Sequence, residues 1–306
     1  MVMINLGGYQ LRPSPLEASI ATIPVEDVDI DVLTVDGRTD EDHTILITEP
    51  YSGYVGRIDE RARLKAIASQ LSARVIAIDN IGLGIGTTHE IPQEVRDGLA
   101  ECDFTPLATR QWDALLAGED ILAQGKLSIV GMSLGVPVAT ALAKNIPKAG
   151  AIDRMVLIEG IYRPGSLGSL GVKFASEMRD WGDYKKQNTD LFRQLQREGK
   201  FPHLGSWAYV YPQALTRPRV KEDLLAAVQA RSFKDSAHLD IVNGSRSRVS
   251  PTADNMTLAR EYRLSTDGTF GSPDMLHTVL QGESHGIIDD LAKYVQLLDI
   301  LLVPRR

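Results

Sequence analysis

The sequence has little of what secreted or disulfide-bonded proteins contain. Cys102 is the single cysteine among 306 residues, so no internal disulfide can form, and no Cys/His spacing suggests a zinc site. Residues 1–15 lack the basic and apolar segments of a signal peptide, and no apolar run approaches the roughly 18 residues of a membrane span. We therefore expect a cytoplasmic protein with no membrane span and no metal site.

No excess of positive charge is present either. The formal net charge is −7, and acidic and basic residues are scattered along the chain. Nucleic acid and anionic membrane surfaces are therefore not expected as partners. A hydrophobic content of 43% is enough for one large core. The oligomeric state stays open at this stage.

Short apolar runs alternate with helical periodicity along most of the chain. The alternating residues of 28–35 predict an edge strand with one face in water. More continuous apolar runs predict strands buried on both faces, at residues 45–47, 75–78, 127–130, 155–158 and 275–280. Helical patterns occupy the regions around 64–71, 112–116 and 288–298. This order predicts an α/β fold, a mostly parallel sheet with helices on both faces.

One segment interrupts the alternation. Residues 161–236 contain helix-like patches, glycine-rich turns and aromatic residues such as Trp181, Trp207 and Tyr209, without a convincing central strand. We interpret this segment as an inserted helical cap, in which the aromatic residues form a small core or line an apolar pocket. The fold's core would then consist of residues 1–160 and 237–306.

The segment Gly131-Met132-Ser133-Leu134-Gly135 carries the clearest chemical signal. It follows the apolar strand at 127–130 and precedes a helical pattern, which is the strand, turn and helix setting of a nucleophile elbow. Small residues at 131 and 135 would allow a tight turn that raises the Ser133 hydroxyl above the sheet. The alternative is an ordinary glycine-rich turn between a strand and a helix.

A serine hydroxyl becomes a good nucleophile only when a base accepts its proton. His285 is the best-placed candidate, because it lies in a loop between the predicted strand at 275–280 and the last helical pattern. The glycines at 282 and 286 would let that loop hold the imidazole over Ser133. The alternative is a solvated surface histidine.

These features resemble the α/β-hydrolase superfamily over nearly the whole chain. Four segments occur in the family's order, namely residues 45–54, the Asp79-Asn80-Ile81-Gly82-Leu83-Gly84 loop, the elbow at Ser133 and the late His285. The resemblance implies a serine hydrolase that needs no cofactor and acts on a small-molecule substrate. The glycines of the second segment lack the spacing of a dinucleotide-binding motif.

The chain departs from the family pattern in the oxyanion loop. The positions where family members often have His-Gly are Glu49 and Pro50 here. Because proline has no backbone N–H, the loop's oxyanion donor is expected from Tyr51 or Ser52, with the N–H of Leu134 as the second donor.

The second departure from the family pattern concerns the acidic residue that would orient His285. The usual aspartate position, three residues after Gly244, is Ser247. Some family members take the acid from the end of an earlier strand, which points to Glu159. The alternatives are Asp254, a dyad without an acid, and a Glu159 that is solvated or paired with Arg163.

Ser133 at the elbow implies cleavage of a carboxylic ester, thioester or lactone through an acyl-enzyme. Two further functions stay open from the sequence. An acyltransferase could use the same residues if the cap excludes water, and the two departures also fit a hydrolase-like binding module without catalysis.

Overall fold

A computed structural model describes most of the chain. The described residues are 1–11, 14–38, 43–50, 55–56, 58–82, 91–118, 121–122, 125–173, 175, 210–267, 269 and 271–303. The strands are β1 (Val2–Ile4), β2 (Ser19–Val25), β3 (Val28–Asp36), β4 (His43–Thr48), β5 (Arg74–Ile78), β6 (Lys126–Met132), β7 (Ile152–Ile158), β8 (Phe233–Gly244) and β9 (Asp274–Leu280). The helices are α1 (Ile58–Leu71), α2 (Gln93–Ala100), α3 (Thr105–Gly118), α4 (Gly135–Lys144), α7 (Val210–Ala214), α8 (Val220–Gln229), α9 (Thr252–Thr266), the 3-10 turn η2 (His285–Asp289) and α10 (Leu291–Leu302).

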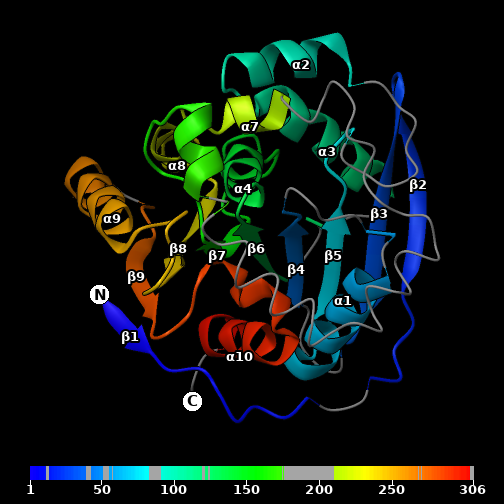
Figure 1. The fold of residues 1–306 in the computed structure, drawn as a ribbon. Coiled ribbons are helices and arrows are strands. Elements are labelled where there is room, and N and C mark those ends of the chain that lie inside the picture. Colours follow the sequence, from blue (N-terminus) through cyan, green and yellow to red (C-terminus); the bar gives the residue numbers. More distant parts are fainter. Residues whose placement is uncertain are drawn as a thin grey trace.

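The described strands form one sheet in the order β1-β9-β8-β7-β6-β4-β5-β3-β2. Neighbours from β1 to β5 run parallel, whereas β3 runs antiparallel to both β5 and β2. Because parallel neighbours point the same way, the carboxyl ends of β6, β7, β8 and β9 lie along one edge of the sheet (Figure 1).

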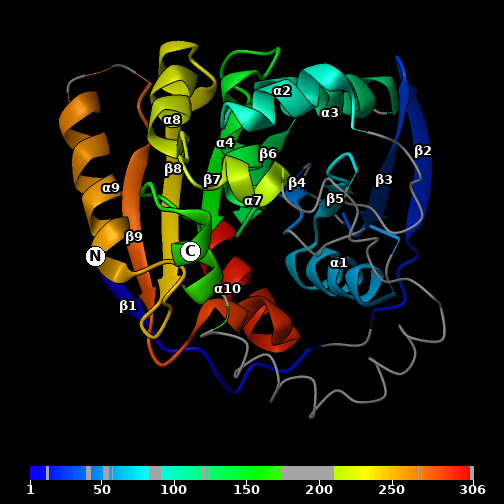
Figure 2. The ribbon, with the colours of Figure 1, turned by 45° about the horizontal axis from the view of Figure 1, so that its top comes forward.

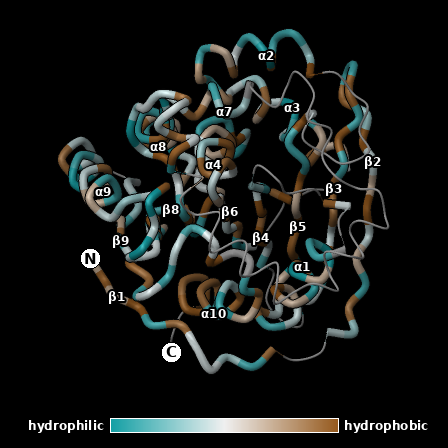
Figure 3. The backbone as a smooth tube through the Cα atoms, viewed as in Figure 1, coloured by the Kyte–Doolittle hydropathy of each residue, from teal (hydrophilic) through white to brown (hydrophobic). Residues whose placement is uncertain are grey.

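Helices cover both faces of the sheet, as the sequence predicts (Figures 1 and 2). Successive strand residues point to opposite faces, so Ile45 and Ile47 join the core beneath α1 and α10, while Leu46 joins the core beneath α3 and α4. Figure 3 shows α10 as one of the most hydrophobic helices, which fits its burial against the sheet. The Asp290 side chain caps α10 by accepting a hydrogen bond from the N–H of Lys293 at 3.2 Å.

The prediction of an edge strand at residues 28–35 is wrong. β2 lies outside β3 and forms that edge of the sheet. Asp31, expected on a wet face, is buried and accepts a hydrogen bond from Thr22 Oγ1 at 2.6 Å. β3 is therefore paired on both of its edges, by β5 and β2, and Asp31 is held by a hydrogen bond from β2.

The predicted insertion, residues 161–236, is described only in part. Its end needs a correction, because β8 begins at Phe233 and residues 233–236 therefore belong to the sheet. α8 packs against α4 and α9, and α7 packs against α2 (Figure 2). Trp181, Trp207 and Tyr209 lie outside the described residues, and the helical cap stays a prediction. Within the described part of the chain, no helix combines the length and the apolar character needed to cross a membrane.

Candidate active site

Backbone hydrogen bonds that continue the sheet beyond its strands bring the site together. The N–H of Ser133, just after β6, donates to Ile158 O at 2.9 Å, and the N–H of Glu159, just after β7, donates to Val242 O at 2.8 Å. The N–H of Ser245, just after β8, donates to the last residue of β9 at 2.9 Å. The carboxyl ends of four adjacent strands are thus joined residue by residue, and the loop with His285 follows the last of them.

The elbow has the tight geometry that the sequence predicts. Ser133 has a φ of 53°, a left-handed conformation that non-glycine residues seldom adopt. A Cβ atom on Gly131 would lie 2.7 Å from the carbonyl oxygen of Gly135, and one on Gly135 would lie 2.2 Å from the carbonyl oxygen of Thr48. The turn can therefore form only with glycine at both positions.

Ser133, His285 and Glu159 form a continuous hydrogen-bonded chain. The Ser133 hydroxyl oxygen lies 3.1 Å from His285 Nε2, and His285 Nδ1 lies 3.1 Å from Glu159 Oε2. Ser133 is 5% exposed and Glu159 is fully buried. The contacts expected from the sequence are therefore present, across 152 residues for the first pair and 126 for the second.

The partners of His285 determine its tautomer. A carboxylate can only accept hydrogen bonds, so Nδ1 carries the hydrogen that faces Glu159. Nε2 then presents a lone pair to the Ser133 hydroxyl. This is the arrangement that a general base requires.

The alternative acid, Asp254, lies elsewhere. It is in the first turn of α9, and its carboxylate forms an ion pair with Arg163 Nε at 3.2 Å. Arg163, considered as a partner of Glu159, also donates to Thr257 Oγ1 at 2.9 Å. Among the described residues, Glu159 is therefore the carboxylate that contacts His285.

Two donors to Glu159 are missing from the sequence-based prediction. The N–H of Gly244 donates to Glu159 Oε1, and the hydroxyl of Ser247 donates to Oε2, both at 2.5 Å. The one available signal was Ser247 itself, a polar residue at the position where the related family usually has its aspartate.

The expected oxyanion donors are described in part. Leu134 is the N-cap residue of α4. Backbone N–H groups at this end of a helix lack intrahelical acceptors. Tyr51 and Ser52 lie outside the described residues. Glu49, at the start of their loop, is buried and paired with Arg63 at 2.8 Å, and its carbonyl oxygen accepts a hydrogen bond from Asn80 Nδ2.

At the other end of this loop, the N–H of Val55 donates to Asp79 Oδ1 at 2.9 Å. Burial, reinforced by the nearby carboxylates of Asp31, Glu49 and Glu60, raises the pKa of Asp79 well above its usual range. Hydrogen bonds with the buried side chains of Asn80 and Asp79 therefore anchor both flanks of the predicted oxyanion loop.

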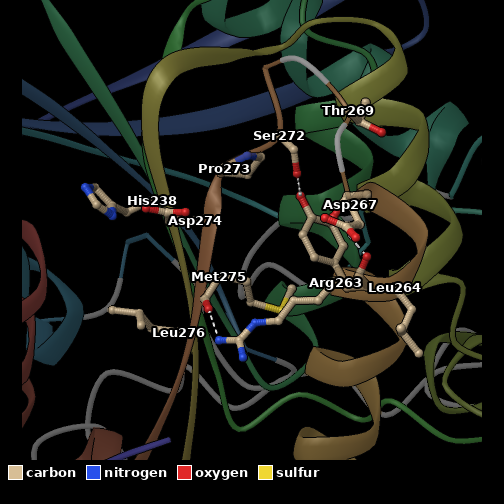
Figure 4. Close-up of a pocket in the computed structure, with 12 residues that line it drawn as sticks. His238, Arg263, Leu264, Asp267, Thr269, Ser272, Pro273, Asp274, Met275 and Leu276 are labelled. Carbon is tan, nitrogen blue, oxygen red and sulfur yellow. Dashed lines mark hydrogen bonds between the residues drawn. The ribbon is translucent and has the colours of Figure 1, made fainter.

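A cavity of about 760 Å³ lies between α9 and β9, at the amino end of β9. Figure 4 shows Arg263 extending to the carbonyl oxygen of Met275. The hydroxyl oxygens of Tyr262 and Ser272 lie 3.3 Å apart. Ser133 lies at the opposite, carboxyl end of the strands. This cavity is therefore separate from the candidate site.

No family model and no curated protein matches the sequence. Several solved structures match the three-dimensional structure over nearly its whole length. A bromoperoxidase from Bacillus anthracis aligns with a TM-score of 0.58 at 14% identity, covering 93% of this chain and 99% of its own. A thioesterase domain from the curacin biosynthetic pathway gives 0.58 at 16% identity, with 92% and 99% coverage. The esterase Pf2001 of Pyrococcus furiosus gives 0.55 at 14% identity, with 98% and 96% coverage.

Proposed function

We propose that this chain, which has the α/β-hydrolase fold, is a serine hydrolase that cleaves ester-type bonds through an acyl-enzyme on Ser133. The observation that carries the proposal is the unbroken hydrogen-bonded chain from Ser133 through His285 to the buried Glu159. The bond cleaved would be a carboxylic ester, thioester or lactone of a small molecule. The structural relatives named as an esterase and a thioesterase support the same class of reaction.

Acylation follows from the positions of these three side chains. Ser133 Oγ attacks the carbonyl carbon of the substrate while His285 Nε2 accepts the hydroxyl proton. Glu159 stabilises the resulting imidazolium through Nδ1. The tetrahedral intermediate then collapses, its bond to the leaving group breaks, and His285 returns the proton to the departing oxygen or sulfur.

Deacylation repeats these steps with water. His285 accepts a proton from the water as its oxygen attacks the acyl carbon, and Ser133 leaves with that proton. In each step the negative charge on the carbonyl oxygen needs donors. We assign these to the backbone N–H groups of Leu134 and Tyr51.

The substrate would enter from the carboxyl ends of the strands, where ligands bind in open α/β sheets. We keep the proposal that an inserted segment forms a cap over this edge. The segment begins near residue 161 and ends where β8 begins. In this arrangement the cap would determine which acyl and leaving groups fit.

Hydrolysis of p-nitrophenyl esters of increasing acyl length, by the wild type and by Ser133→Ala, tests the proposal. We expect the wild type to hydrolyse at least one ester with saturable kinetics. Ser133→Ala should lose at least about 1,000-fold in kcat, because no other group can replace the nucleophile. Thermal unfolding of both proteins would verify that the variant is folded.

A folded wild type that hydrolyses none of these esters, or a variant that retains a tenth of the rate, would refute the proposal. Added alcohols distinguish hydrolysis from acyl transfer, since a transferase would form the new ester in preference to the free acid.

A further inference from the structure

The turn after β8 occupies the place of the usual acid but contains no carboxylate. Its residues, Gly244 to Ser247, contact Glu159 on one side and the loop that leads to His285 on the other. We propose that this turn is a positioning element for the catalytic pair, and that the Ser247 hydroxyl holds the Glu159 carboxylate in line with His285. The inference rests on the proposed serine hydrolase function.

The contacts of Ser247 fix the direction of its hydroxyl. Its oxygen accepts a hydrogen bond from the N–H of Ser250 at 3.0 Å, so its own hydrogen is left for Glu159 Oε2 at 2.5 Å. Ser250 is held in turn by Asn255, whose Nδ2 donates to Ser250 Oγ at 3.0 Å. Since Ser247, Ser250 and Asn255 are all buried, the donor is built into the fold and is not a mobile surface hydroxyl.

Each oxygen of Glu159 consequently has a fixed donor from this turn. Oε1 accepts from the N–H of Gly244, while Oε2 accepts from Ser247 and also faces His285 Nδ1. A buried carboxylate is costly unless such hydrogen bonds compensate for the loss of water. Two donors from one turn also prevent the carboxylate from rotating away from the imidazole.

The same turn is joined to the loop before His285. The N–H of Arg246 donates to Glu283 O, and the N–H of Gly282 donates to Ser245 Oγ, both at 2.9 Å. A Cβ atom on Gly244 would lie 2.3 Å from the carbonyl oxygen of Glu283. The two loops can therefore approach this closely only because residue 244 is glycine, and movement of one displaces the other.

Glu159 itself has a backbone conformation that needs such support. Its φ of 57° is left-handed, a conformation that is unfavourable for a non-glycine residue. Ser133 shares this feature, and the elbow enforces it by close packing of its glycines. For Glu159, the backbone N–H donates to Val242 O, and the hydrogen bonds from Gly244 and Ser247 hold the carboxylate.

Kinetics of Ser247→Ala, alone and combined with Glu159→Gln, test the proposal. Losing a hydrogen bond to a charged group should reduce kcat by roughly 10- to 100-fold, with KM changed by less than about threefold. In the Glu159→Gln background the same substitution should cost less than about threefold, because Ser247 acts through the carboxylate. Ser272→Ala, in the distant α9–β9 cavity, is the matched control for loss of a serine hydroxyl.

Ser247→Thr provides a second measurement, because it keeps the hydroxyl and should retain most of the activity lost in Ser247→Ala. Thermal unfolding of every variant would establish that it is folded. The proposal is overturned if folded Ser247→Ala keeps kcat within about threefold of the wild type. It is also overturned if Ser247→Ala lowers kcat by the same factor in the wild type and in Glu159→Gln. Either result would leave the proposed function intact, because that function is tested separately, by ester hydrolysis with the wild type and with Ser133→Ala.

Discussion

Two turns at the same edge of the sheet differ in how they contribute to the site. The elbow after β6 contains the proposed nucleophile, Ser133, and the turn after β8 contributes only hydrogen-bond donors to a carboxylate that lies on a third turn. Both contain a glycine where a Cβ atom would collide with backbone. In the proposed mechanism, local backbone geometry thus fixes the nucleophile, whereas hydrogen bonds from a neighbouring turn fix the acid.

The strongest test of this comparison is Glu159→Gln. Because the β8 turn has no carboxylate to replace it, we expect kcat to fall by roughly 1,000- to 10,000-fold with folding preserved, as when a triad acid is lost. Steady-state kinetics on the best p-nitrophenyl ester would measure the effect.

Asp254→Asn is the matched control, since it removes the carboxylate that pairs with Arg163 and should change kcat by less than about threefold. If the control variant lost more activity than Glu159→Gln, the acid would have been assigned to the wrong strand end.

The elbow should be sensitive to added volume. In Gly135→Ala the new Cβ would meet the carbonyl oxygen of Thr48 at 2.2 Å, so we expect a loss of about 3 kcal/mol or more in the free energy of unfolding. Gly171→Ala, where no atom lies within 4 Å of the new Cβ, is the control. Urea unfolding would compare the two, and equal stabilities would contradict the packing account.

Protonation of His277 should affect stability below neutral pH. Its Nε2 lies 2.7 Å from Asn243 Oδ1, next to the β8 turn, and burial, with the positive N-terminus and Arg263 nearby, lowers its pKa from 6.5 to about 4. The unfolded chain then binds more protons between these values, so stability is lost as the pH falls from 6.5 towards 4. We expect about 1–3 kcal/mol from this residue.

The measurement is urea unfolding of the wild type and His277→Gln at several pH values. Burial raises the pKa of Asp240 from 3.8 to about 6. Its effect on stability is opposite to that of His277, because its contribution is lost as the pH rises towards 6. The difference between the two proteins removes this contribution. A difference that does not change between pH 7 and pH 4.5 would disprove the role of His277.

The smallest effect is expected in the cavity between α9 and β9. Leu264 lines this cavity and is 71% exposed, so Leu264→Lys should be folded and should leave kcat and KM within about twofold of the wild type. The same ester assay would check this. A large change in KM would mean that the substrate binds there and not at the carboxyl ends of the strands.

The sequence predicts most of the strands, and it predicts the three residues of the candidate site but not the turn that holds Glu159. Continuous apolar runs reveal the central strands because both faces of these strands are buried. β2 went unrecognised because most of its residues are exposed and it contains Pro24, so no hydrophobic pattern marks it. Its absence from the prediction made β3 look like an edge.

The site shows the same division between local and distant information. The elbow is evident because Gly131, Ser133 and Gly135 lie within five residues and obey one steric requirement. The contact of Ser247 with Glu159 joins residues 88 positions apart, and no periodicity encodes it. Only the register of β7 against β8 places them together.

The central claim is that Ser133 is an activated nucleophile, and labelling with a fluorophosphonate probe tests it most directly. Only a serine whose proton is accepted by a neighbouring base should react quickly, so peptide mapping by mass spectrometry should find the probe on Ser133 in the wild type. Ser133→Ala should remain unlabelled, and His285→Ala should react far more slowly. A folded wild type that takes up no probe, or takes it up on another serine, would contradict the account and favour a hydrolase-like binding module.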